Sequence, residues 1–195
     1  MEIVVDLAVH RRHSGLMPPS PLAGVVPSDL ELVAAAQDGD RDAFGLLYER
    51  YAPMVHGVLL ARVPYDCVDD LVQDVFLAAL ERLPTLRKPA AFPGWLAAIG
   101  RNRAADHHRE TPVLPLPPDV RSPDPGPQPD ALAVLAVIRS LPDAYRETLT
   151  MRLVEGMTGP EIAARTGLTP ASVRVNLHRG MKRLREKLAL QRTEP

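Results

Sequence analysis

The side chains with the most specific binding chemistry in this chain are the basic and amide groups between residues 174 and 187. An arginine can donate two hydrogen bonds to O6 and N7 of guanine, and an asparagine pairs in a similar way with adenine. Arg174 and Arg179 therefore suit guanine, and Asn176 suits adenine. Lys182 and Arg183, further along, suit phosphate oxygens, which carry no sequence information. The pattern predicts a surface that binds duplex DNA.

A helix is needed to hold these side chains on one face, and residues 158–188 have the pattern of a helix-turn-helix. Thr158 and Glu161 can form a capping box at the start of a first helix, and Gly167 suits its left-handed C-cap. Thr169 can cap a second helix. That helix has an apolar stripe at three- and four-residue steps, made of Val173, Leu177, Met181, Leu184 and Leu188. The alternative is a helical hairpin whose basic face is only solvated.

Charge is distributed unevenly along the 195 residues, although the net charge is only −1. Residues 28–110 carry 9 lysines and arginines against 13 acids, whereas residues 131–195 carry 11 against 6. A basic C-terminal part suits phosphate, and an acidic N-terminal part suits a basic protein surface. The two parts therefore suit different partners.

Catalytic and metal-binding patterns are absent from the sequence. It contains no nucleophile–base pair, no glycine-rich phosphate loop and no cysteine cluster, so we expect neither an enzyme nor a cofactor. His107 and His108 are adjacent on a predicted helix and point about 100° apart, so they cannot chelate one metal ion together. Cys67 is the only cysteine, which is typical of a reducing cytoplasm. No apolar run approaches the ~20 residues that cross a membrane.

The periodicity predicts an all-α chain of two small helical domains. Four helices are expected in residues 28–110, starting at Ser28, at Asp42, at Asp66 and at Pro93. Residues 111–130 include eight prolines and are expected to be a flexible linker. Residues 1–27 are expected to be a disordered tail, and the helices resume in a second domain at residues 131–190.

Two helix faces in the first domain carry candidate binding residues. Asp70, Gln73 and Asp74 lie opposite an apolar face that includes Leu71, Val75 and Leu80, and they form an acidic surface. The alternative is an ordinary solvated face. On the fourth helix, Asn102, Asp106 and Arg109 recur at i, i+4 and i+7 and therefore share a side, next to Arg103. We expect Trp95 to be a core residue, because its spacing with Leu96 and Ile99 is that of a buried face.

Three blocks of sequence, in order, resemble the small bacterial sigma factors of the extracytoplasmic-function type, in the sigma-70 family. Residues 69–77 (DDLVQDVFL) are similar to the family's D-L-x-Q-[ED]-x-F-L block. Residues 92–109 are similar to F-x-x-W-L-x-x-I-x-R-N-x-x-x-D-x-x-R. Residues 141–188 are similar to the L-P-x-x-x-R, E-G and E-I-A motifs followed by a recognition helix. The resemblance covers about residues 28–110 and 131–190.

This resemblance implies a factor that binds core RNA polymerase and directs it to promoters. It implies that Asp70, Gln73 and Asp74 meet the clamp coiled coil of the polymerase, and that the second domain meets the flap. It places the side of Asn102 and the loop before it against the single-stranded bases of the minus-10 element, with Phe92 as the better candidate for stacking on a base. It places Arg174, His178 and Arg179 against the minus-35 element. An anti-sigma factor is a further candidate partner, and no membrane contact is expected.

Two alternatives to a sigma factor remain at this point. One is a one-component helix-turn-helix regulator, and the other is a site-specific recombinase, although no catalytic module precedes the turn. For a sigma factor, we further predict that the two domains are independent bodies and that protease cuts the free protein first within residues 111–130.

Overall fold

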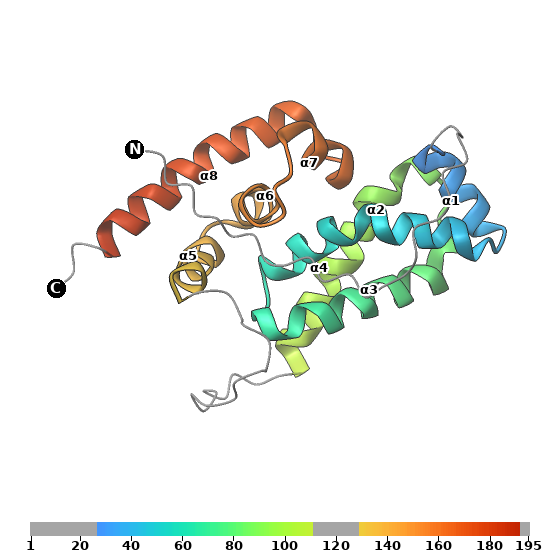
Figure 1. The fold of residues 1–195 in the computed structure, drawn as a ribbon, viewed down its shortest axis with the longest axis horizontal. Helices are drawn as coiled ribbons and strands as arrows, with labels where there is room; N and C mark the ends of the chain where they lie inside the picture. The colour runs from blue at the N-terminus through green and yellow to red at the C-terminus, as the bar shows by residue number, and fades with distance from the viewer. Residues whose placement is uncertain (1–26, 111–128, 192–195) are drawn as a thin grey trace, which may run out of the picture.

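The computed structural model describes residues 27–110 and 129–191, and every regular element within them is a helix (Figure 1). The first group comprises α1 (Asp29–Gln37), α2 (Arg41–Leu60), α3 (Val68–Arg82) and α4 (Phe92–Glu110). The second comprises α5 (Pro129–Arg139), α6 (Asp143–Leu153), α7 (Gly159–Thr166) and α8 (Pro170–Gln191). Short 3₁₀ turns occupy Tyr65–Cys67, Leu83–Thr85 and Pro89–Ala91. The predicted all-α fold is confirmed. The expected disordered tail and flexible linker fall outside the described residues, apart from their last one or two positions.

Most of the predicted helix ends are confirmed by their capping contacts. Ser28 and Thr158 each form a complete capping box, with Glu31 and Glu161 respectively, and Gly167 ends α7 with φ of 73°. The prediction that Asp42 caps the second helix is wrong. The cap is Asp40, whose Oδ1 accepts hydrogen bonds from the backbone N–H groups of residues 42 and 43 at 2.9 and 3.0 Å.

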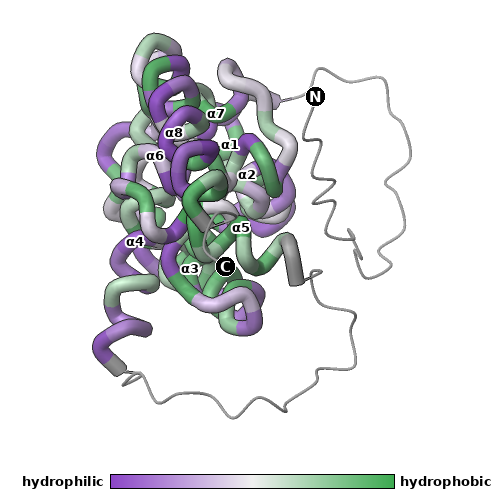
Figure 2. The backbone as a smooth tube through the Cα atoms, turned by 90° about the vertical axis from the view of Figure 1, so that its left-hand side faces the viewer, coloured by the Kyte–Doolittle hydropathy of each residue, from purple (hydrophilic) through white to green (hydrophobic). Residues whose placement is uncertain are grey.

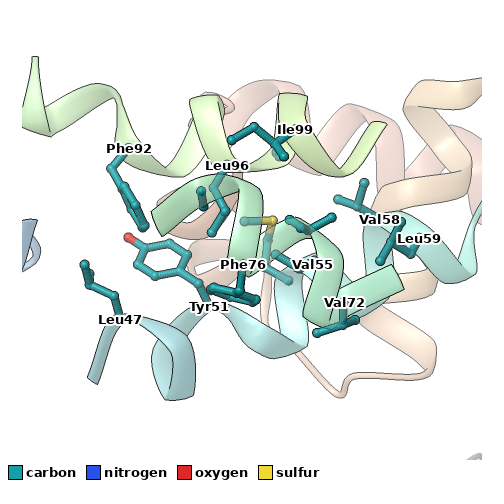
Figure 3. Close-up of a cluster of buried hydrophobic side chains, with 14 of the residues drawn as sticks. Leu47, Tyr51, Val55, Val58, Leu59, Val72, Phe76, Phe92, Leu96 and Ile99 are labelled. Carbon is teal, nitrogen blue, oxygen red and sulfur yellow. The ribbon is translucent and has the colours of Figure 1, made fainter. Parts of the chain in front are cut away.

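The first group packs around α2, whose buried side chains face both α3 and α4 (Figure 3). Tyr51 is fully buried, with its ring 5.2 Å from that of Phe92, centroid to centroid. The Tyr51 hydroxyl donates to Asp29 Oδ2 at 2.5 Å. Burial and this hydrogen bond raise the pKa of Tyr51 well above its usual value, so the phenol stays protonated. The contact ties α1 to the core of the bundle.

The second group places α8 across α6, and the predicted apolar stripe is its contact face. Val173 and Leu184 are buried, and Leu177, Met181 and Leu188 are partly buried. Gly180 permits the close approach, because a β-carbon there would lie 3.1 Å from Leu149 Cδ1. The helix-turn-helix is thus held by packing on one side of α8 only.

The two groups also pack against each other, so the expectation of independent bodies is wrong for this conformation. Figure 1 shows α6 lying between α8 and α2. Met151 of α6 and Ile162 of α7 are completely buried in the same apolar cluster as the residues of α2 and α4. A β-carbon on Gly57 of α2 would lie 3.0 Å from Met151 Cγ. Sequence periodicity shows that a face is apolar, but it does not show which partner covers that face.

One contact between the groups is sensitive to pH. His56 Nδ1 of α2 lies 2.5 Å from Glu155 Oε1, just after α6. Burial lowers the pKa of His56, but the hydrogen bond and charge of Glu155, with the charge of Asp69 on α3, outweigh it and raise the pKa above 6.5. Because the pKa is raised, this pair stabilises the structure fully below about pH 6.5, the unfolded value. The stabilisation is lost as the pH rises through the raised pKa of His56.

We therefore predict that replacing Glu155 with glutamine lowers the pKa of His56, since both stabilising effects of the carboxylate disappear while burial remains. An NMR titration of the His56 ring in the full chain measures this directly. An unchanged titration in Glu155→Gln would show that the two side chains do not meet in solution.

Candidate nucleic-acid interface

The outward side of α8 presents the cations that the sequence assigned to DNA. Arg174, His178, Arg179, Lys182 and Arg183 are exposed, and Asn176 is half-buried. Hydrophilic and hydrophobic residues are interspersed along the tube of this helix (Figure 2). Since the apolar stripe fixes the rotation of α8 against α6, its other side must face outward. The structure therefore leaves the five predicted cations of α8 exposed, whereas Asn176, the predicted adenine contact, lies partly under cover.

Two of these cations already have contacts within the protein. Lys182 Nζ lies 4.0 Å from Glu186 Oε1 across one helical turn, which is an exposed and weak ion pair. The guanidinium of Arg183 lies 5.5 Å from the ring centroid of Tyr145 on α6. Arg174 and Arg179, by contrast, have no ion pair or cation–π contact within the described residues. They are thus the cations of this surface with the fewest competing partners.

Sequence reasoning missed two arginines beside this surface. A groove of about 590 Å³ runs between α6 and α8, with Leu177 and Met181 at its floor. Arg152 and Arg185 line it together with His178 and Lys182. Arg152 comes from α6, so only the crossing of the two helices brings it to the others. Arg185 was visible as a cation but had no assigned role.

The α4 surface is only partly available. Asn102 and Arg109 are exposed, and Arg103 and Asp106 are half-buried. Arg109 forms an ion pair with Asp106, so their charges offset each other. Arg101, which precedes Asn102, is turned toward α6 and bonds to Glu147. Of the two exposed residues in this set, Asn102 is therefore the one without an ion pair to another residue of the set.

The prediction that Phe92 stacks on a base is wrong for this conformation. Its side chain is completely buried and lies beside Tyr51 (Figure 3). The centroid of its ring is 5.2 Å from that of Tyr51 and 5.9 Å from that of Trp95. Trp95 is half-buried and borders the same core, in agreement with its predicted core role. Phe92 begins α4 directly after the 3₁₀ turn Pro89–Ala91, and its ring is part of the apolar core. Between these two aromatic residues, only Trp95 keeps exposed surface.

Asp70, Gln73 and Asp74 are all exposed on α3, as predicted. Two leucines extend this surface along the helix: Leu77 is 60% exposed and Leu80 is 45% exposed. The expectation that Leu80 faces inward is therefore wrong. The buried face of α3 includes Val75 and Ala79, and Leu80 lies outside it.

Nowhere in residues 27–110 and 129–191 do three or more metal-ligating side chains gather in a way that could hold an ion. Within the same ranges, none of the helices has the length and apolar character needed to cross a bilayer.

The chain matches two family models, one for each group of helices. Sigma-70 region 2 matches residues 47–111, and Sigma-70, region 4 matches residues 131–184. The ECF RNA polymerase sigma factor SigD of Mycobacterium tuberculosis is 34% identical over 175 residues, covering 80% of this chain and 82% of SigD. The RNA polymerase sigma factor CarQ of Myxococcus xanthus is 31% identical over 161 residues, covering 78% and 92%. The chain belongs to the extracytoplasmic-function sigma factors of the sigma-70 family.

A solved structure agrees with this assignment. CnrH, a sigma factor of Cupriavidus metallidurans, was solved in complex with the cytosolic domain of CnrY. It is similar to this chain with a TM-score of 0.56 and 28% identity, covering 83% of this chain and 97% of CnrH. As a sigma factor, the protein binds core RNA polymerase and promoter DNA and directs transcription initiation. The alternative of a one-component regulator is not favoured.

Proposed function

We propose that the outward side of α8 reads the minus-35 element, that α4 contacts the melted minus-10 element, and that the acidic surface of α3 binds the polymerase clamp. The observation that supports this most strongly is the common exposure of Arg174 and Arg179 on a helix whose rotation is fixed by packing. For the minus-10 element, the assignment rests on Asn102, followed by Arg103, Asp106 and Arg109.

We further propose that the region 2 domain spans residues 28–110 and the region 4 domain spans residues 131–190. The factor itself supplies binding energy and no catalysis, since sigma factors are non-catalytic initiation factors and the polymerase forms the phosphodiester bonds. Its place of action is then the cytoplasm, where polymerase meets DNA. Because CnrH binds the cytosolic domain of CnrY, we propose an anti-sigma partner for this chain as well.

In vitro transcription with core polymerase tests the proposed function. The purified chain should confer initiation at particular promoters on a core enzyme that lacks any other sigma factor. A chain with Asn102, Arg174 and Arg179 all replaced by alanine should bind core enzyme normally but lose promoter selection. If the triple variant selected promoters as well as the wild-type chain does, the proposed roles of Asn102, Arg174 and Arg179 in DNA binding would be wrong.

A single-residue comparison separates base reading from phosphate binding on α8. Arg174→Ala should cost about 1–3 kcal/mol and relax the preference at one promoter position. Lys182→Ala should weaken all sequences alike and lower the salt dependence by about one counterion. Holoenzyme transcription across a randomised minus-35 library measures both effects.

Arg174→Lys is the matched control, because it keeps the charge and loses the planar pair of donors. It should lose preference much as Arg174→Ala does, while retaining more of the overall binding. If Arg174→Ala and Lys182→Ala caused the same uniform loss, Arg174 would be a phosphate contact.

A further inference from the structure

The side chain of Gln37 connects helix α1 to the α3–α4 loop, residues 83–91. Gln37 is the last residue of α1. Its amide nitrogen donates to the backbone oxygen of Leu83 at 3.0 Å and to that of Leu86 at 2.8 Å. A backbone oxygen can only accept a hydrogen bond, so the NH₂ group of the amide must face this loop. Both donors of Gln37 are thus used to hold it.

Within the described residues, the other hydrogen bonds of the α3–α4 loop are local. They join positions three residues apart, such as the N–H of Leu86 and the oxygen of Leu83 at 3.0 Å. Pro84 and Pro89 fix φ in the 3₁₀ turns at the two ends of the loop. The stretch between these turns lacks such a constraint, and Leu86 lies at its start. Gln37 therefore supplies the hydrogen bonds that tie this stretch to another helix.

Gln37 is itself held on a rigid support. Val33 and Ala36, on the same helix, are buried in the core. The backbone N–H of Asp38, the next residue, bonds to oxygens of the last turn of α1 at 3.1 Å. A side chain on a packed helix holds its partner more precisely than one on a free loop can. The position of α1 is thus transmitted to the α3–α4 loop.

The α3–α4 loop presents two adjacent cations. Arg87 and Lys88 directly follow the anchored Leu86, and both are exposed. In residues 27–110 and 129–191, neither forms an ion pair or a cation–π contact. The loop leads directly into α4, which carries Asn102. Cations of this kind suit the phosphates of a nucleic-acid strand, because proteins that bind single strands follow the backbone with positive charge.

We propose that Gln37 is a positioning residue for promoter opening, which holds the α3–α4 loop so that Arg87 and Lys88 bind phosphates of the melted minus-10 strand. This inference rests on the proposed function of α4. A loop that already has its binding shape loses less conformational freedom when DNA binds, so binding is tighter. Gln37 acts only through the loop and does not touch DNA.

Two substitutions of Gln37 separate its hydrogen bonds from its packing. Gln37→Met keeps the length and the helix propensity but has no donor, whereas the ammonium group of Gln37→Lys can donate to both backbone oxygens. NMR relaxation of the free full-length chain measures the order of the loop without polymerase or DNA. The order parameters of Arg87 and Lys88 should fall from about 0.8 to below about 0.6 in Gln37→Met and stay near the wild-type values in Gln37→Lys.

The consequence for DNA is measured with holoenzyme, as permanganate reactivity of unpaired thymines at a promoter selected in the transcription assay above. Gln37→Met should lower open-complex formation about fivefold to tenfold, and Gln37→Lys should keep it near the wild-type level. In a chain with Arg87→Ala and Lys88→Ala, adding Gln37→Met should lower it by less than about twofold, because Gln37 acts through these cations. A merely structural role would cause the same loss in both backgrounds.

Three results would overturn the positioning role: an ordered loop in Gln37→Met, wild-type opening by Gln37→Met, or an equal loss with and without the two cations. Loss of opening in Gln37→Lys as large as in Gln37→Met would also contradict it. The proposed function fails in a different way, since a wild-type holoenzyme would then open no promoter although the loop remained ordered by Gln37.

Discussion

Replacing Asp70 and Asp74 together with lysine is expected to weaken binding of core RNA polymerase by about 100-fold or more. Both side chains are exposed on α3 and neither contributes to the apolar core, so the fold should remain intact. If the partner surface is basic, each substitution exchanges an attraction for a like-charge contact, which costs several kcal/mol across an interface. The exposed Leu77 and Leu80 next to these acids would then lose their own contacts as well.

Pull-down against core polymerase measures this effect, with circular dichroism to check the helices. Asp38→Lys with Asp42→Lys is a suitable control, since it changes the charge equally at exposed positions at the end of α1 and in the first turn of α2. It should bind nearly as the wild type does. Undiminished binding by the α3 variant would mean that this surface is only solvated and that the clamp meets region 2 elsewhere.

Phe92→Ala is expected to destabilise region 2 by about 3–5 kcal/mol, which is the usual cost of removing a fully buried aromatic ring. The ring packs against the rings of Tyr51 and Trp95, and its loss leaves a cavity that α2 and α4 cannot close without moving. A residue that stacked on a flipped base would show the opposite pattern, with lost promoter melting and unchanged stability.

Denaturant unfolding followed by circular dichroism gives the free energy of unfolding directly. Leu77→Ala serves as the reference, because that side chain is 60% exposed on α3 and should change stability by less than about 0.5 kcal/mol. A Phe92→Ala chain as stable as Leu77→Ala would return Phe92 to the candidates for base stacking.

Local sequence was sufficient for the parts of this protein that depend on local interactions. Capping boxes at Ser28 and Thr158, the left-handed Gly167 and the stripe that includes Val173 and Leu184 all act within a few residues. Helix ends and helix faces follow from such contacts, because backbone hydrogen bonding in a helix is itself local. The resemblance of both domains to sigma factors could likewise be recognised from the sequence, because the family's motifs are short and contiguous.

Only the tertiary structure decided which apolar and charged groups meet across the chain. Phe92 and Leu80 are both large apolar residues on predicted helices, yet Phe92 is fully buried and Leu80 is exposed. The packing of α2, α3 and α4 determines which apolar positions of each helix lie inside. Nothing in the sequence distinguishes Glu147 from an ordinary surface acid. The packing of α6 places it between Arg62 and Arg101, which lie 85 and 46 residues earlier in the chain. A charge is stabilised by what surrounds it in space, so its role follows from the packing of helices that are distant in the sequence.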